Sequence, residues 1–251
     1  MKVGIIGYGW VGKATHKLFP DAVIHDKYQV AYWNPLPQCD IVFLAVPTPW
    51  RDTVLDCTEV ESAIAYCTSD LIVIRSATTP GFADAMAAKY NNRIVVQPEY
   101  LGESPAHPML DMAGRQFMIL GGDPADRRAV IDCYATVYNA NIGIRQVTRT
   151  EAEIIKLSEN RAIFYKVMQC QELYDACEAA GIDYYTVRDA VYGDDPRMNL
   201  WWTFVYPNRR GADSKCLPKD VRAWLAWAES TGIDASATKS LLAYNESLLT
   251  K

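Results

Sequence analysis

The feature that most constrains this fold is a glycine pattern close to the N-terminus. The segment 7–12, GYGWVG, follows a short apolar strand-like segment, 2–6, and leads into a helical stretch that continues through Leu18. In such a strand, turn and helix, the first glycine permits a tight turn and the second lets a pyrophosphate approach the backbone, while the third lets helix and strand pack closely. The helix N-terminus then faces the anion. The predicted cofactor contacts in this loop are Gly7, Tyr8, Gly9, Trp10, Val11 and Gly12.

A second strand-like segment, 23–26, ends in an acid about 20 residues after the glycines begin. An acid at this place binds the ribose 2′-hydroxyl of a dinucleotide, and its charge repels a 2′-phosphate. Asp26 therefore favours NAD over NADP.

Further apolar runs predict an α/β fold with a Rossmann dinucleotide-binding domain over residues 1–148. Buried strands are expected at 41–46, 71–74, 94–96 and 117–120, a closing strand at 142–147, and helices at 56–67 and 123–138. The run 41–46 ends in Pro47-Thr48-Pro49, at the sheet edge where ligands bind in open α/β folds. Val46, Pro47 and Thr48 are therefore predicted cofactor contacts as well.

The second half of the chain predicts an all-helical domain over residues 149–251. Apolar residues from 150 to 180 fit one long amphipathic helix, and shorter helices are expected at 182–191, 221–230 and 235–249. A helix of about 30 residues is ~45 Å long, more than a small domain needs, so we expect part of its apolar face to form a homodimer. Cys170 and Cys177, one heptad apart, are interpreted as core residues.

Lys156 and Asn160 stand four residues apart on this long helix and so share a face. A cation beside an amide could stabilise an oxyanion, although an ordinary surface pair is the alternative. Farther along, Cys216 has Lys215 on one side and Lys219 and Asp220 on the other. This stretch combines a nucleophile, cations that favour a thiolate and a carboxylate that could move protons, but a buried structural cysteine flanked by solvated charges remains open.

Two further stretches also have two interpretations each. The loop 97–104 contains the carboxylates Glu99 and Glu103, which fit either a ligand site or a solvated acidic turn. The aromatic residues of the segment 201–206 are core, dimer contacts or substrate contacts. They are Trp201, Trp202, Phe204 and Tyr206.

Composition excludes several classes of function. A net charge of -5 without a basic run argues against nucleic acid as a partner. Seven scattered cysteines without a CxxC pair, and three histidines without neighbouring ligands, predict no metal site. No apolar run is long enough to span a bilayer, and the N-terminal stretch lacks the apolar region of a signal peptide, so we expect a cytoplasmic protein.

Taken in order, these motifs resemble the UDP-glucose/GDP-mannose dehydrogenase family of nucleotide-sugar dehydrogenases. The matching motifs are Gly7-Gly9-Gly12, Asp26, Val46-Pro47-Thr48-Pro49, the PEYLGE segment 98–103, Ala152-Glu153 with Lys156 and Asn160, Asp195-Pro196-Arg197, and the segment 211–220 around Cys216. Several ordered matches are more specific than any one of them.

The resemblance implies a four-electron oxidation of a sugar primary alcohol to a carboxylate with two NAD molecules, through a thiohemiacetal and a thioester on Cys216. It implies that Lys156 and Asn160 stabilise the oxyanions and that Asp220 and Glu103 manage water and protons, with Glu103 also beside the cofactor. The implied substrate is an anionic nucleotide sugar. Its implied contacts are Glu99, Tyr100, Leu101, Lys156, Arg197 and Gly211.

Three departures separate this chain from the family pattern. Asp213 and Ser214 stand where the family has glycines, and Ala77 stands where it has threonine, so a water-positioning hydroxyl is missing unless Thr78 supplies it. The chain also ends where the linker to a second Rossmann-like domain would begin, which predicts a short form without that domain. Two alternatives therefore stay open: a two-electron NAD-dependent dehydrogenase of a smaller hydroxy compound, and a non-catalytic NAD-binding dimeric subunit.

Overall fold

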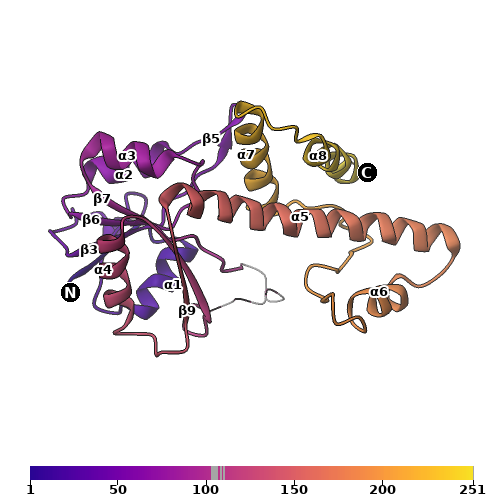
Figure 1. Cartoon of the computed structure of the whole chain (residues 1–251), viewed down its shortest axis with the longest axis horizontal. Helices are drawn as coiled ribbons and strands as arrows, with labels where there is room; N and C mark the ends of the chain where they lie inside the picture. The colour runs from indigo at the N-terminus through magenta and orange to yellow at the C-terminus, as the bar shows by residue number, and fades with distance from the viewer. Residues whose placement is uncertain (103–106, 108, 110, 251) are drawn as a thin grey trace. The chain divides into compact units, whose positions relative to one another are not determined.

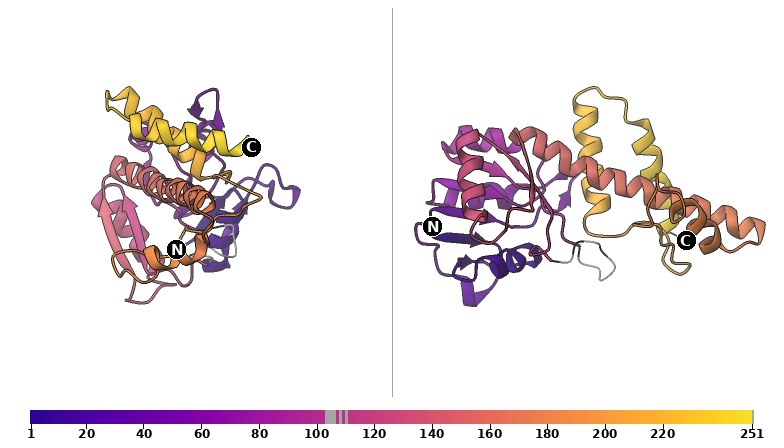
Figure 2. Two further views of the ribbon diagram at one scale, coloured as in Figure 1. Left: turned by 90° about the vertical axis from the view of Figure 1, so that its right-hand side faces the viewer. Right: turned by 60° about the horizontal axis from the view of Figure 1, so that its bottom comes forward.

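The computed structural model describes residues 1–102, 107, 109 and 111–250. The chain forms two compact units, Met1–Lys156 and Leu157–Lys251, each of which is described by itself. One continuous helix, α5 (Arg149–Ala180), supplies its first two turns to the first unit and the remainder to the second. Figures 1 and 2 show the elements of both units.

The first unit is built on a seven-stranded sheet in the order β2-β1-β3-β6-β7-β8-β9. The strands are β1 (Val3–Ile6), β2 (Val23–His25), β3 (Ile41–Leu44), β6 (Leu71–Ile74), β7 (Arg93–Val96), β8 (Phe117–Gly121) and β9 (Gly143–Val147). β1 pairs in parallel with β2 on one side and with β3 on the other, so the chain reverses its direction of winding at β1. Ligands bind at such a switch point in open α/β sheets. The predicted α/β fold class is confirmed.

β8 pairs antiparallel with β7, whereas the other neighbouring strands of this sheet pair in parallel. The described residues between these two strands form no helix. A parallel neighbour needs a crossover connection, usually a helix, so β8 runs back beside β7 instead. The next connection does contain a helix, α4 (Pro124–Tyr134), and β9 is accordingly parallel to β8.

Alternate residues of the strands face two apolar layers. One layer joins Leu44 and Ile74 to α2 (Thr58–Tyr66) and α3 (Phe82–Tyr90), and the other joins Phe43 and Val73 to α4 and to Phe19, directly after α1 (Trp10–Leu18). α2 and α3 thus cover one face of the sheet, and α1 and α4 the other (Figure 1).

Three short elements were absent from the sequence prediction. α3 is rich in alanine and weakly amphipathic, so its apolar period is faint, although Gly81 and Asn91 bound it in left-handed conformations. A hairpin of β4 (Trp50–Arg51) and β5 (Val54–Leu55) turns through two residues with positive φ. A single 3-10 turn, η1, spans Val30–Tyr32.

The second unit packs helices on two parts of α5. Phe164 and Met168 contact α7 (Leu217–Ser230) and α8 (Ser236–Leu249), whereas Cys170 and Cys177 contact α6 (Tyr184–Tyr192). The interpretation of these two cysteines as core residues is confirmed. In the described part of the chain, no helix has both the length and the apolar character that a membrane crossing requires.

One predicted helix start was wrong, and one of the three interpretations of the aromatic segment 201–206 is excluded for three residues. α7 begins at Leu217 rather than at residue 221, because Pro218 fits the first turn of a helix, where a missing N–H costs nothing. The core interpretation fails for three aromatic residues of the segment 201–206. Trp201, Phe204 and Tyr206 are exposed by 48%, 50% and 57%.

Two glycines of the loop 7–12 differ in the space available for a side chain. Substituting each by alanine therefore tests how tightly this loop is packed. A Cβ atom on Gly12 would lie 2.0 Å from the carbonyl oxygen of Gly7, whereas a Cβ atom on Gly9 would meet nothing within 4 Å. We expect Gly12→Ala to lower the free energy of unfolding by about 3 kcal/mol and Gly9→Ala to lower it by less than about 1 kcal/mol. Urea unfolding measures both, and equal losses would contradict the packing described here.

Candidate functional site

The glycine loop leaves its second glycine open. Gly7 has φ 92°, its N–H donates to the carbonyl oxygen of His25 (2.9 Å), and a Cβ atom there would lie 2.5 Å from the carbonyl oxygen of Ala45. The turn therefore fits only glycine at this position. Gly9 is exposed and is the N-cap residue of α1, and a Cβ atom on it would meet nothing within 4 Å. This arrangement fits the pyrophosphate of a dinucleotide.

Asp26 lies at the end of β2, beside this loop. Its carboxylate accepts hydrogen bonds from the backbone N–H groups of Tyr8 (2.7 Å) and Tyr28 (2.8 Å). The side-chain amide of Gln29 donates both to Asp26 (3.1 Å) and to the carbonyl oxygen of Tyr8 (3.0 Å). The neighbouring cation, Lys27, is 2.6 Å from Glu59. Lys27 is thus engaged by a carboxylate, and the carboxylate of Asp26 itself disfavours a 2′-phosphate.

The ends of β3 and β6 are joined by a side-chain hydrogen bond. The hydroxyl of Ser76 donates to the carbonyl oxygen of Val46 (2.7 Å), and Thr48, two residues on, is buried, whereas Pro47 is exposed. The predicted cofactor contacts Val46 and Thr48 therefore belong to a segment fixed by the loop after β6.

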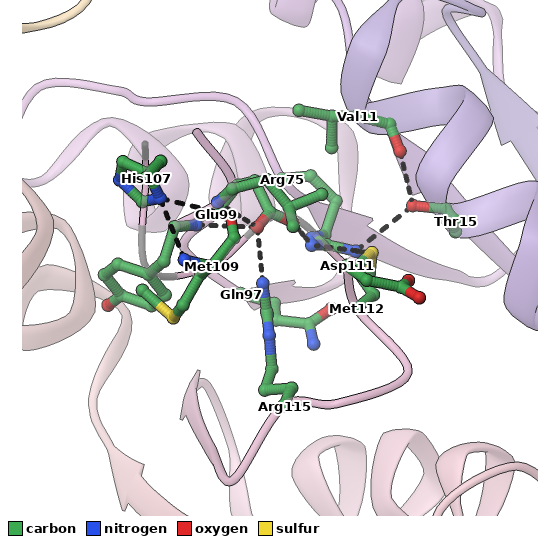
Figure 3. A network of polar contacts seen from close by, with 12 residues as sticks. Val11, Thr15, Arg75, Gln97, Glu99, His107, Met109, Asp111, Met112 and Arg115 are labelled. Atoms are coloured by element: carbon green, nitrogen blue, oxygen red, sulfur yellow. Dashed lines mark hydrogen bonds and ion pairs between the residues drawn. The ribbon is translucent and has the colours of Figure 1, made fainter. Parts of the chain in front are cut away.

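Glu99 is buried in the first unit (Figure 3). Its carboxylate forms ion pairs with the guanidinium groups of Arg75 and Arg115, and it accepts the backbone N–H groups of Tyr100 (2.6 Å) and Leu101 (2.8 Å). The interpretation of this loop as a solvated acidic turn is therefore wrong for Glu99. The second carboxylate of the loop, Glu103, lies outside the described residues.

Arg75 is completely buried and connects the end of β6 to α1 and α4. It donates to the Thr15 hydroxyl on α1 (3.2 Å) and to the Tyr134 hydroxyl on α4 (3.4 Å), and Tyr134 donates in turn to the side chain of Gln97 (2.8 Å). Burial lowers the pKa of Arg75 to about 10, so this side chain is still a cation at neutral pH. Neither arginine is among the site residues predicted from sequence, although an arginine directly after the apolar strand 71–74 was an available indication.

Lys156 lies against the ring of Tyr100, with its ammonium nitrogen 4.9 Å from the ring centroid. The guanidinium carbon of Arg115 is 5.9 Å from the same centroid. A cation over an aromatic face is stabilised by the ring quadrupole. A predicted catalytic cation and a predicted substrate contact therefore touch, and the backbone of Tyr100 is fixed by Glu99.

In the second unit, Asn160 and Asp220 form a buried pair. The Asn160 amide donates to one carboxylate oxygen of Asp220, and the Lys219 ammonium donates to the other. The backbone N–H of Asp220 donates to the carbonyl oxygen of Cys216 (2.9 Å), one turn before it on α7. Asn160, Asp220 and Cys216 are therefore brought together within one unit.

Cys216 itself is exposed and stands at the N-cap of α7. The interpretation as a buried structural cysteine is therefore wrong. The N-terminus of a helix favours negative charge, which suits a thiolate. Ser214, one of the departures from the family pattern, accepts a hydrogen bond from the backbone N–H of Leu217 (3.1 Å) and so helps to cap the same helix, and Asp213 pairs with Arg209 (2.8 Å).

The loop before the cysteine is fixed by a residue that sequence analysis missed. Asn245 on α8 accepts the N–H of Ala212 (2.7 Å) and donates to its carbonyl oxygen (3.1 Å), while Gly211 has φ 78° and leaves no room for a side chain beside Asn245. Arg197, in contrast, is largely exposed. It pairs with Asp195 (2.6 Å) and lines a groove of about 540 Å³ in the second unit.

Within the described residues, no group of three or more histidine, cysteine or acidic side chains could hold a metal ion.

These features define a class: a Rossmann-type sheet followed by a helical unit that presents a thiol beside a buried amide and carboxylate. The model of the UDP-glucose/GDP-mannose dehydrogenase family, central domain, matches residues 150–247. The predicted resemblance to this family is therefore confirmed.

Individual relatives agree with this result. A UDP-glucose 6-dehydrogenase of Rhizobium meliloti is 26% identical over 224 residues, which include 82% of this chain and 50% of the relative. A GDP-mannose 6-dehydrogenase of Pseudomonas syringae pv. tomato is 29% identical over 83% of this chain and 51% of the relative. The chain thus spans about half the length of the curated relatives it matches.

Solved structures show the same fold. A UDP-glucose dehydrogenase of Pyrobaculum islandicum superposes with a TM-score of 0.80 at 20% identity, covering 98% of this chain and 68% of the other. A UDP-D-ManNAc dehydrogenase of Pyrococcus horikoshii gives the same TM-score at 18% identity.

The exposure of Cys216 can be tested on the folded protein. Iodoacetamide should modify Cys216 well before the buried residues Cys133 and Cys170, because only an accessible thiolate reacts. Peptide mass spectrometry after short labelling times measures the order, with Cys216→Ser as the control for assignment. Labelling of Cys216 no faster than of Cys170 would contradict its place at the start of α7.

Proposed function

We propose that this chain is an NAD-dependent nucleotide-sugar 6-dehydrogenase that oxidises a primary alcohol to a carboxylate. The observation that carries the proposal is the buried pair Asn160 and Asp220 one turn from the exposed Cys216. The open Gly9 and the acid Asp26 support NAD as the oxidant, which would accept one hydride in each of two steps.

The overall reaction converts R–CH₂OH, two NAD⁺ and water into R–COO⁻, two NADH and three protons. Loss of the first hydride and the alcohol proton leaves an aldehyde, and the Cys216 thiolate adds to its carbon to form a thiohemiacetal. Loss of the second hydride leaves a thioester. Water then cleaves the C–S bond and releases the carboxylate.

The proposed side-chain roles are those that the family resemblance implies. Asn160 and Lys156, four residues apart on α5, are the proposed stabilisers of the oxyanion, as the resemblance implies. Asp220, oriented by Asn160 and Lys219, is the proposed acceptor of the proton from water. Glu103 remains a proposed partner in proton transfer and at the cofactor.

The proposed substrate is an anionic nucleotide sugar, as the names of the relatives suggest. Tyr100, Leu101, Lys156, Arg197 and Gly211 remain the proposed contacts. Because the carboxylate of Glu99 is occupied by two arginines, we assign it to positioning this loop rather than to direct contact.

We also propose that the chain acts as a cytoplasmic homodimer. Several large aromatic and aliphatic side chains of the second unit are exposed, and we assign the interface to this part of the chain. These residues are Ile182, Tyr185, Val191, Met198, Leu200, Trp201, Phe204 and Tyr206.

One observation favours the two-electron alternative. Thr78 is buried and its hydroxyl donates to Glu153 (2.8 Å), so it does not replace the hydroxyl that the family pattern has at residue 77. Without help in positioning water, hydrolysis of a thioester would slow, and the reaction could be confined to the first oxidation.

The yield of NADH from a limiting amount of sugar nucleotide separates these functions. With UDP-glucose, GDP-mannose and related substrates, we expect two NADH for each sugar from the wild type and at most one from Cys216→Ala. One NADH from both proteins would establish the two-electron reaction. No NADH with any substrate, while NADH still binds, would favour the non-catalytic subunit.

The cofactor site can be tested without a substrate. Gly9→Ala should weaken NADH binding at least about tenfold, because a methyl group would stand where the pyrophosphate approaches the backbone. Fluorescence titration measures this affinity, and the small effect of this variant on unfolding separates binding from folding. Unchanged affinity would contradict the placement of the pyrophosphate at this loop.

A further inference from the structure

Glu153, in the first turns of α5, is a buried carboxylate that caps a different helix. It is 1% exposed. It accepts the hydroxyl of Thr78 (2.8 Å) and the backbone N–H groups of Gly81 (2.7 Å) and Ala83 (2.9 Å). The two N–H groups belong to the start of α3, whose N-cap residue is Gly81 and forms no side-chain cap of its own. Glu153 therefore supplies the cap that α3 lacks.

The segment capped in this way reaches the proposed cofactor edge. Thr78 and Gly81 belong to the loop between β6 and α3, residues 75–81. Near the beginning of this loop, Ser76 donates to the carbonyl oxygen of Val46 (2.7 Å), after β3. β3 is the neighbour of β1 at the switch point of the sheet, and Gly7 packs against Ala45 directly after β3. A continuous set of contacts thus runs from Glu153 through the loop 75–81 to the glycine loop.

We propose that Glu153 is a positioning residue for the dinucleotide: by holding the loop 75–81, it sets the affinity of this sheet edge for the cofactor. This proposal rests on the NAD site of the proposed function. Nothing in it requires Glu153 to touch the cofactor or the substrate.

The geometry makes this role depend on ionisation. All three groups that face the Glu153 carboxylate donate hydrogen bonds, so the ionised form satisfies them and a protonated form would place an O–H against one of them. Burial raises the pKa of Glu153 to about 7, with the hydrogen bonds from Ala83, Thr78 and Gly81 opposing that rise. Of the charged groups nearby, Asp84 on α3 also raises this pKa, and Asp84 is paired with Arg149 on α5 (3.2 Å).

The test measures NADH affinity by fluorescence between pH 5.5 and 8.5. In the wild type, affinity should rise about tenfold as Glu153 ionises near pH 7, the effect of roughly one hydrogen bond. Glu153→Gln keeps the size but presents an N–H to one donor at every pH, so it should bind NADH weakly without this step. His16 contacts Tyr8 of the glycine loop and the carbonyl oxygen of His25 accepts the N–H of Gly7, so the measured quantity is the difference between the two proteins.

Two matched variants make the test specific. Glu151→Gln alters an exposed carboxylate near the start of α5 and should behave as the wild type. Thr78→Val removes one hydrogen bond that lowers the pKa of Glu153, so the pH step should move to higher pH. A merely structural role for Glu153 would give no such displacement, and Thr78→Val keeps the test valid if Glu153→Gln folds poorly.

A second readout needs no cofactor. Since folding raises the pKa of Glu153 from 4.5 to about 7, the folded state binds the proton more tightly than the unfolded state. The free energy of unfolding of the wild type, relative to Glu153→Gln, should therefore fall as the pH rises from 4.5 through 7. Urea unfolding across this range measures it, and a flat difference would overturn the assignment of the titration to Glu153.

The outcomes separate this proposal from the proposed function. If the wild type and Glu153→Gln bind NADH with the same pH dependence, the positioning role is overturned and the NAD site stands. If the wild type binds no NADH at any pH, the NAD site is overturned together with this role. The positioning role is supported if the rise of NADH affinity near pH 7 is absent in Glu153→Gln and occurs at higher pH in Thr78→Val.

Discussion

The edge of the sheet depends on one buried carboxylate between two buried guanidinium groups. Glu99 pairs with Arg75 and Arg115, and Arg75 extends the cluster to α1 through Thr15 and to α4 through Tyr134. Breaking a buried ion pair by removing one partner typically costs about 3–5 kcal/mol, because the other charge stays buried without compensation. Removal of Glu99 would leave two such charges. The ion pairs of Glu99 therefore fix the loop after β7. They also fix the position of Tyr100, whose ring contacts Lys156.

The two units contribute different parts of the proposed chemistry. The first provides an open glycine turn, an acid at the end of β2 and a cation against an aromatic ring. The second provides a thiol at a helix start and a carboxylate oriented by an amide. Departures from the family pattern are accommodated locally, because Ser214 adds a hydrogen bond to the start of α7 and Asp213 pairs with Arg209. The cysteine stays exposed at the helix start despite both changes.

Much of the fold could be predicted because its periodic patterns are strong. The buried strand segments 41–44 and 71–74 are continuous apolar runs, and the helix predicted over 150–180 is α5 (Arg149–Ala180). α3 was missed because alanine marks no apolar face, and the direction of β8 was missed because pairing depends on the connection rather than on the strand.

The candidate site was less predictable, since burial of charge depends on tertiary partners. The sequence indicated that Glu99 is acidic but not that Arg75 and Arg115 surround it, from 24 residues before it and 16 after it. Likewise Glu153 reads as an ordinary helix residue until α3 is known to begin beside it. Cys216, Asn160 and Asp220 were found through a resemblance of motifs, and their contacts follow from the packing of α7 on α5.

The central claim, covalent catalysis by Cys216, is tested most directly by trapping its intermediate. The protein would be mixed with NAD and a turned-over sugar nucleotide, quenched in acid within the first turnover and digested for peptide mass spectrometry. The account predicts that the peptide containing Cys216 carries the added mass of the oxidised sugar nucleotide, bound as a thioester that hydroxylamine removes. An unmodified Cys216 peptide throughout the first turnover, while carboxylate product accumulates, would contradict it.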